Sequence, residues 1–339
     1  MSNRKFINLF QERNIFNAVV LFGLIFLVVI LSLSRGSVEL SNEEILKAFF
    51  RQGDVTNQII FWELRLPRLI ASLLVGSALG MSGALLQGML RNGLASPYLL
   101  GISAGSGLII VLLISLGLWL SWIPIAAWIG AIITTLIVYS LAKSGSSISV
   151  ERLILAGVAL SSLFGAIQSM LLLQTEDGRV QAALTWLIGS LNSRGWNEIN
   201  LAGPPIVFAL VMGLLLSRQL NLLGLGDELS VGLGNSLFRS RCLIGASATL
   251  LAASSVSVGG LIGFVGLIVP HAVRFLFGTD YRVVLPFSAL LGAFTLSAAD
   301  LIARSGSIEL PVGIITSLIG APIFILLLYR RQKKLANLR

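Results

Sequence analysis

The stretch that decides the fold runs from Trp62 to Gly88 and reads W-E-L-R-L-P-R-L-I-A-S-L-L-V-G-S-A-L-G-M-S-G-A-L-L-Q-G. After Arg68 it carries no charge, and its length matches the roughly 20 residues that a helix needs to cross a bilayer. Small residues that recur every four positions give this helix one smooth face, on which a second helix can pack closely. These residues are Gly76, Gly80, Ala84 and Gly88.

The composition of the whole chain agrees with a membrane protein. Of its 339 residues, 55% are hydrophobic and 12% are charged, against about 25% charged residues in soluble domains. The 24 Lys and Arg against 15 Asp and Glu give a net charge of +9, which in this class reflects basic cytoplasmic loops rather than nucleic-acid binding. A single cysteine, Cys242, and a single histidine, His271, exclude an intramolecular disulfide and a His-rich metal site.

Ten apolar stretches follow one another along the chain, so we predict an all-α, polytopic membrane protein that forms a single domain over residues 1–339. The first stretch also fits a signal peptide, but no A-x-A-like cleavage site follows it. The predicted spans are 15–33, 69–90, 99–117, 123–141, 153–173, 201–216, 243–260, 261–277, 283–301 and 312–328.

The distribution of charges and aromatic residues predicts the orientation. Ten spans place both termini on one side, and 16 of the 24 Lys and Arg fall in segments on that side. Because cytoplasmic loops are enriched in these residues, we expect both termini in the cytoplasm. The aromatic residues fit belts at the two membrane surfaces. The predicted outer belt holds Trp62, Trp119, Trp122, Trp128, Trp186 and Trp196, and the inner belt holds Tyr98, Tyr139, Tyr281 and Tyr329.

Several kinds of chemistry are missing from the sequence. It has no G-x-x-x-x-G-K-[ST] phosphate loop and no H-E-x-x-H, C-x-x-C or G-x-S-x-G cluster. The predicted spans are almost free of ionisable residues, which ion-coupled carriers need within the bundle. We therefore expect neither an enzyme nor a bound cofactor, and we expect a transporter of this kind to be driven by a partner.

Arg65 and Arg68 are the first candidate site residues. They lie three positions apart, hence on one face, at the predicted outer end of a helix that Pro67 can begin. Cations at this position oppose both the helix dipole and the positive-inside bias. Two readings remain open at this point: anchoring to phosphates or to Glu63, and docking of a partner.

A polar segment over about 222–241 is the second candidate site. It is part of the longest polar connection on the predicted inner side, and it places charged groups around small residues. A solvated connector and a docking element for a cytoplasmic partner are both compatible with it. The candidate coupling residues are Asp227, Glu228, Gly232, Gly234 and Arg239.

Six motifs in order resemble the FecCD-type permeases, the membrane subunits of bacterial ABC importers for iron-siderophores, haem and vitamin B12. The resemblance covers about residues 60–330, and one departure is Asn92-Gly93, where the family commonly has Asn-Pro. The motifs are R-L-P-R-L-I-A…L-L-Q-G, N-G-L-A-S-P-Y-L-L-G-I-S-A-G, R-L-I-L-A-G-V-A-L, W-L-I-G-S-L, G-F-V-G-L-I-V-P-H-A-V-R and E-L-P-V-G-I-I-T-S-L-I-G-A-P-I-F.

The resemblance implies a type II ABC importer permease fold and a set of partners. Two permeases, two ATPase subunits and an extracytoplasmic binding protein would assemble in the bacterial cytoplasmic membrane. The fifth span, the short helix after it and the tenth span would line the path, with an inner gate at Ser149 and Val150. The segment A-R-S-G-S-I-E-L-P adds Arg304 to Arg65 and Arg68 as the docking site for the binding protein.

The predicted function is therefore that of an importer permease, with a ferric siderophore as the expected cargo. Haem and vitamin B12 are the alternative cargoes, since no group in the chain selects among them. An ion-coupled secondary carrier, a membrane enzyme and a structural scaffold are the rival classes. The first two predict polar clusters that are not seen, and the third leaves the ordered motifs unexplained.

Overall fold

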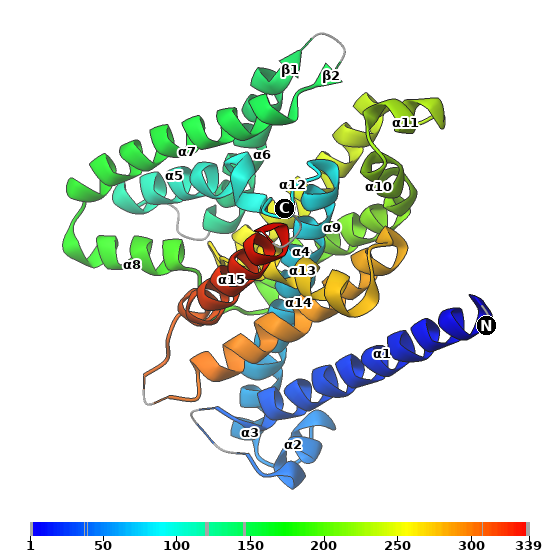
Figure 1. Ribbon diagram of the computed structural model, residues 1–339. Coiled ribbons are helices and arrows are strands. Elements are labelled where there is room, and N and C mark those ends of the chain that lie inside the picture. Colours follow the sequence, from blue (N-terminus) through cyan, green and yellow to red (C-terminus); the bar gives the residue numbers. More distant parts are fainter. Residues whose placement is uncertain are drawn as a thin grey trace.

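The computed structural model describes residues 3–36, 38, 40–118, 122–144, 147–306 and 308–336. Figure 1 shows a bundle of helices, so the predicted all-α class is confirmed. Its helices and strands are α1 Asn3–Ser34, α2 Asn42–Phe49, α3 Val55–Ile59, η1 Ile60–Arg65, α4 Leu66–Met89, η2 Pro97–Leu100, α5 Ile102–Ser115, α6 Ile123–Ala142, β1 Lys143–Ser144, β2 Ser147–Ile148, α7 Val150–Leu173, α8 Asp177–Ile188, α9 Trp196–Leu215, α10 Ser217–Gly224, α11 Asp227–Gly232, α12 Leu237–Gly259, α13 Val265–Phe277, α14 Tyr281–Ala303 and α15 Val312–Ala336.

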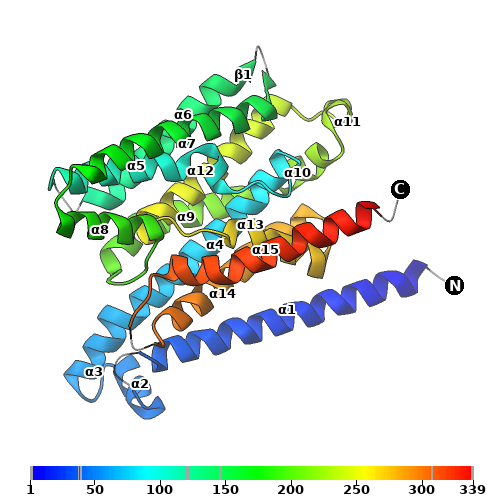
Figure 2. The same cartoon turned by 60° about the vertical axis from the view of Figure 1, so that its left-hand side comes forward.

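Each of the ten predicted spans coincides with one helix: α1, α4, α5, α6, α7, α9, α12, α13, α14 and α15. Seven helical stretches in the described residues are long and apolar enough to cross a membrane, and α5, α13 and the apolar part of α15 are shorter. Figure 2 shows α1 beginning and α15 ending at the same end of the bundle. We call this the terminal end and the opposite one the distal end.

The centre of the bundle is α4, in which 18 of 24 residues are buried. Gly76 and Gly80 of its glycine face pack directly against the backbone of α14. A Cβ atom on Gly76 would lie 2.3 Å from the carbonyl oxygen of Gly292, and one on Gly80 would lie 2.2 Å from that of Ser288. The predicted packing role of this face is therefore confirmed, because only glycine fits at these two positions.

Pro67 lies in the first turn of α4, as predicted, but the chain is already helical before it. A continuous helical stretch of 35 residues runs from Val55 to Met89, and its turn at Ile60–Arg65 is a π-helix. Leu66 N–H donates to the carbonyl of Phe61, five residues back. Proline lacks the N–H for an i→i−4 bond and its ring crowds the carbonyl four residues earlier, so a wider turn accommodates it.

The prediction that 99–117 and 261–277 are full spans is also corrected. The helices there, α5 and α13, have 14 and 13 residues, or about 21 and 20 Å of rise, against a hydrocarbon core of about 30 Å. A Cβ atom on Gly266, at the start of α13, would lie 2.9 Å from the carbonyl oxygen of Leu79, near the middle of α4. Thus α13 begins inside the bundle.

The side chain of Tyr98 stabilises the break between α12 and α13. Phe264, just before α13, has a left-handed backbone with φ 65°. The Tyr98 hydroxyl donates to the carbonyl of Ile262 in the same break, which satisfies an acceptor where water is scarce. Tyr98 was therefore wrongly predicted in an inner surface belt. Trp119, predicted in the outer belt, lies outside the described residues.

Candidate functional site

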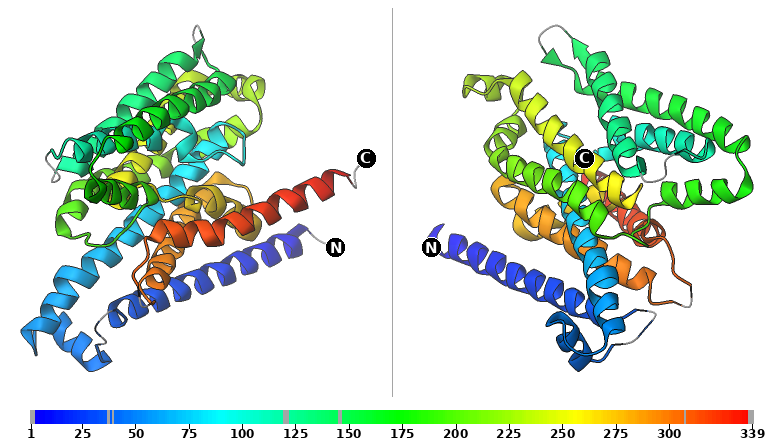
Figure 3. Two further views of the ribbon diagram at one scale, coloured as in Figure 1. Left: turned by 90° about the vertical axis from the view of Figure 1, so that its left-hand side faces the viewer. Right: turned by 180° about the vertical axis from the view of Figure 1, so that it is seen from behind.

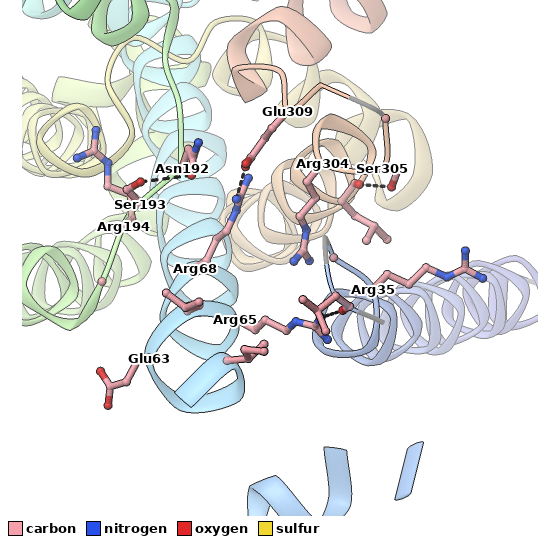
Figure 4. A pocket seen from close by; sticks show the side chains of 17 residues that line it. Arg35, Glu63, Arg65, Arg68, Asn192, Ser193, Arg194, Arg304, Ser305 and Glu309 are labelled. Carbon is pink, nitrogen blue, oxygen red and sulfur yellow. Dashed lines mark hydrogen bonds and ion pairs between the residues drawn. The ribbon is translucent and has the colours of Figure 1, made fainter. Parts of the chain in front are cut away.

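The distal end of the bundle brings the three predicted docking arginines together. Arg65, Arg68 and Arg304 line one hollow of about 830 Å³, which opens between α4, the end of α14 and the segment that precedes α9. Figure 4 shows their side chains around this hollow. Its lining also includes Arg35, Arg194, Glu63 and Glu309, so positive charge dominates it.

Arg65 and Arg304 contact the end of α1. The guanidinium of Arg65, which is 5% exposed, donates to the carbonyls of Leu33 at 2.6 Å and Ser34 at 2.9 Å. Arg304 donates to the carbonyl of Ser32 at 2.8 Å. The last carbonyls of a helix have no partner within it and carry the negative end of its dipole, so cations stabilise them. Both arginines thereby fasten α1 to the bundle.

Arg68 has two acidic partners, and it shares one of them, Asp300, with Arg304, whose Nε lies 3.7 Å from that carboxylate. The Nε of Arg68 and one of its terminal nitrogens donate to the two carboxylate oxygens of Asp300 at 3.0 and 2.8 Å. Its other terminal nitrogen pairs with Glu309. The side chain of Asp300 is 3% exposed and that of Glu309 is 35% exposed, so one partner is internal and the other lies at the rim. A bidentate pair of this kind fixes geometry as well as charge.

The sequence left open whether Arg65 and Arg68 serve as anchors or dock a partner, and these contacts answer part of that question. The alternative of a pair with Glu63 is not seen: among the described residues, no ion pair joins Glu63 to these arginines, and Figure 4 shows it pointing away from them. Sequence reasoning missed Asp300 and Glu309 as partners. The available signal was Asp300 itself, a carboxylate within an apolar span, because such a group is retained only when it is paired. Docking of a partner at this hollow stays a prediction.

The hollow also includes a loop arginine that sequence reasoning passed over. Arg194 lies in the segment between α8 and α9. Burial lowers the pKa of its guanidinium, and the carboxylate of Glu198 acts in the opposite direction. Even so, a guanidinium stays charged at neutral pH. The hollow is thus a permanently cationic surface, which suits anionic groups of a partner.

At the terminal end, an acidic residue organises the predicted coupling segment. Asp227, the first residue of α11, pairs with Arg241 at 2.8 Å and with Arg91 at 3.1 Å. It therefore joins α11, the start of α12 and the connection after α4. Asn235 donates to the hydroxyl of Ser230 at 2.8 Å and closes the turn between these helices. The segment is held in shape from within.

The rest of the coupling segment faces outward. Glu228 and Arg239 are exposed, and a Cβ atom on Gly232 or Gly234 would have no neighbour within 4 Å. Large apolar side chains are exposed beside them, and such patches typically mark interaction sites. Those with more than 40% of their surface exposed are Leu225, Leu229, Val231, Leu233 and Phe238.

The predicted gate residues lie where α7 begins. The Ser149 hydroxyl accepts a hydrogen bond from the Arg152 N–H at 3.4 Å and caps the helix, and Val150 packs on the central core. Beyond them, only Leu153 and Gly157 are buried among the residues of α7. Figure 3 shows α7 and α8 on the opposite side of the molecule from α1.

The departure at Asn92-Gly93 has a structural explanation. A Cβ atom on Gly93 would lie 3.0 Å from Nε2 of His271. The other ring nitrogen, Nδ1, lies 3.1 Å from the carbonyl oxygen of Leu267 within the same helix. Glycine at position 93 therefore leaves room for the imidazole, which packs between α13 and this turn.

Comparisons with known proteins agree with this architecture. The family model described as the FecCD transport family matches residues 24–330. The cobalamin import system permease protein BtuC of Halobacterium salinarum is 42% identical over 82% of this chain and 75% of its own length. The iron(3+)-hydroxamate import system permease protein FhuG of Bacillus subtilis is 38% identical over 92% and 96%.

A solved structure shows the same fold. It is described as an inward-facing conformation of a metal-chelate type ABC transporter, and it superposes with a TM-score of 0.83 at 33% identity. The match covers 92% of this chain and 99% of the other. The all-helical membrane fold and the motif resemblance therefore agree with these comparisons, and this chain belongs to the FecCD transport family.

Proposed function

We propose that this FecCD-family permease imports a ferric siderophore along a path at the interface between two permease subunits. One observation carries the proposal: α7 is an apolar helix of 24 residues with only two buried positions. Its exposed side presents Ser162, Gly165 and Ser169 among large apolar residues. Both serine hydroxyls donate to carbonyls of α7 itself, at 3.0 Å, so this face is smooth and only weakly polar, which suits a path for a bulky cargo.

The elements that the family places beside this path are also exposed. Leu184 and Ile188 of α8 and Leu318 and Ile319 of α15 each have at least 40% of their surface exposed. Together with α7 they form an apolar side that a second copy, or a related permease, would cover. Interfaces between permanently associated subunits are apolar in this way. Ser149 and Val150, at the beginning of α7, would then form the inner gate.

The energy source would dock at α11. The apolar patch of the coupling segment suits a cleft on a cytoplasmic ATPase subunit, and the ion pairs of Asp227 would transmit its motion to α12. We expect Gly232→Trp to lower ATP-driven uptake while leaving insertion intact, because the added ring has open space within this chain. Gly23→Trp, equally open but in α1, is the matched control. Equal uptake by the two variants would contradict the assignment.

The binding protein would dock at the distal hollow. Acidic side chains of the partner would meet Arg68 and Arg304, with Arg65 holding the surface in shape. Removing one member of a partly desolvated pair typically costs about 2–5 kcal/mol, or roughly 30- to several-thousand-fold in affinity. We expect an acid-to-lysine change on the partner to weaken docking by this amount and Arg68→Glu on the permease to restore part of it. Independent losses in the two variants would count against docking here.

The orientation follows from the same arrangement. The terminal end would lie in the cytoplasm of a bacterium and the distal end outside its cytoplasmic membrane, because 16 of the 24 Lys and Arg fall on the predicted cytoplasmic side. A cysteine introduced at exposed Phe238, in a variant with Cys242→Ser, would test this. Labelling by a membrane-impermeant reagent in inverted vesicles, and not in intact cells, is the expected result.

The cargo can be tested through the binding protein that co-purifies with this chain. A ligand that binds the folded state raises the melting temperature of that protein. We expect a ferric hydroxamate to do so and haem and cobalamin not to. Stabilisation by cobalamin but by no iron chelate would overturn the siderophore proposal. Uptake by proteoliposomes with and without the ATPase subunit then tests the mode of transport, since an ion-coupled carrier would work without it.

A further inference from the structure

Glu309 is the second acidic partner of Arg68. It lies on the segment that connects α14 to α15, and its carboxylate pairs with Arg68 at the edge of the distal hollow. Figure 4 shows Glu309 reaching Arg68 from this segment. On the inner side, Asp300 already accepts hydrogen bonds from Nε and one terminal nitrogen of Arg68. The guanidinium therefore has one permanent partner and one at the surface.

The Glu309 contact covers the part of Arg68 that a docking partner could reach. The inner face of the guanidinium is taken by Asp300, whose side chain is 3% exposed. Arg65 is no substitute, because its nitrogens donate to main-chain carbonyls at the end of α1. An acidic side chain that enters the hollow therefore meets an Arg68 that is already paired with a carboxylate of the same chain.

The segment that carries Glu309 is also joined to the elements proposed to line the path. Two residues after Glu309 comes Pro311, and then Gly313 in the first turn of α15 donates to the carbonyl of Gly189 at 3.0 Å. A Cβ atom on Gly313 would lie 1.8 Å from the carbonyl oxygen of Ile188, the last residue of α8. A shift of this segment would therefore displace the beginning of α15 and the end of α8 together.

We propose that Glu309 holds the position on Arg68 that a carboxylate of the binding protein takes on docking. The partner carboxylate then replaces Glu309 on Arg68 and releases the segment that leads into α15. This inference rests on the proposed function and deepens it by naming the group that is exchanged. One carboxylate takes the place of another, so Arg68 keeps its charge balance throughout. The exchange converts docking at the hollow into a change at the beginning of α15.

Glu309→Gln tests the exchange because it removes the competitor while keeping the size of the side chain. Glu63→Gln is the matched control, since Glu63 lines the same hollow and loses the same charge without contacting Arg68. With the permease and ATPase in nanodiscs and the co-purifying binding protein as the probe, we expect Glu309→Gln to tighten docking by roughly three- to tenfold beyond the control. Equal affinities of the two variants would overturn the inference.

A second measurement follows the segment itself. Ile308 is 74% exposed, so a spin label on Ile308→Cys, with Cys242→Ser, reports the mobility of the segment beside Glu309. We expect docking to raise this mobility in the otherwise unchanged protein, and Glu309→Gln to raise it without the partner. A label that responds to neither would overturn the exchange. If the unchanged complex fails to bind the partner at all, the proposed function itself falls, which separates the two failures.

Discussion

The helices α4 and α7 have the same length of 24 residues and similar apolar composition, yet they occupy opposite environments. In α4, 18 residues are buried, and its glycines meet the backbone of α14. In α7, two residues are buried, and a Cβ atom on its Gly165 would have no neighbour within 4 Å. Small residues thus allow close helix packing in α4 and leave an open surface in α7. Small residues in an apolar helix therefore do not by themselves indicate which of the two environments the helix occupies.

The largest expected effect comes from disrupting the close packing of α4 against α14. Gly76→Leu places a side chain where a Cβ atom alone would lie 2.3 Å from a carbonyl oxygen of α14. The two helices must separate, and we expect a loss of more than about 3 kcal/mol in the free energy of unfolding, above the usual range for overpacking. Thermal unfolding in detergent measures it. Gly23→Leu in α1, where the added atoms have open space, is the control and should unfold like the unchanged protein.

The next effect concerns the ion pair that fixes the distal end of α4. Asp300→Asn leaves Arg68 with Glu309 alone, and removal of one partner from a buried pair costs about 3–5 kcal/mol. We expect a value near the lower limit, about 3 kcal/mol, because Glu309 remains. Unfolding of Asp300→Asn beside Glu63→Gln gives the measurement. A loss no greater than that of the exposed Glu63 would show that the pair does not stabilise the bundle.

A smaller effect is expected at the beginning of α7. Ser149→Ala removes the hydroxyl that caps the helix, and such losses cost about 0.5–2 kcal/mol. The bond is long, at 3.4 Å, so we expect about 0.5 kcal/mol. Uptake measured in parallel separates a cap from a gate. If uptake changes no more than the melting temperature implies, Ser149 serves α7 as a cap only.

The smallest effect on stability sharpens the comparison. Gly165→Leu in α7 meets no neighbour and improves helix propensity, so the isolated subunit should gain between 0 and about 0.8 kcal/mol. Uptake should nevertheless fall, because the new side chain would extend into the proposed path. Unfolding and uptake must be measured on the same preparation. Normal uptake by Gly165→Leu would place this face of α7 against lipid.

Much of the fold could be read from the sequence because each span is an apolar run bounded by polar residues. All ten stretches coincide with helices. The half-length α5 and α13 could not be read in this way, since their starting points depend on partners far along the chain. The break before α13 requires the Tyr98 hydroxyl on the carbonyl of Ile262, a contact across 164 residues that no local pattern contains.

In the candidate site, too, the sequence identified some features and missed others. The pairing of Arg65 and Arg68 on one face followed from their spacing, and Arg304 followed from a motif. Their partners did not: Arg65 donates to carbonyls of α1, and main-chain groups leave no trace in residue types. Glu309 is separated from Arg68 by 241 positions. Local spacing identifies the charged groups, while the tertiary fold decides which of them face a partner.

The fastening of α1 by Arg65 and Arg304 has a consequence for synthesis on the ribosome. The element that α1 contacts most extensively is α14, which begins at Tyr281, about 250 residues after α1 ends at Ser34. At about 5–20 residues per second, some 12–50 s pass before this partner emerges. During that time α1 must persist in the bilayer without its partner. Of the seven long spans, the Asn14–Ser34 part of α1 has the highest mean hydropathy, 2.8. The span that must stay inserted without its main partner is therefore also the one most stable in lipid.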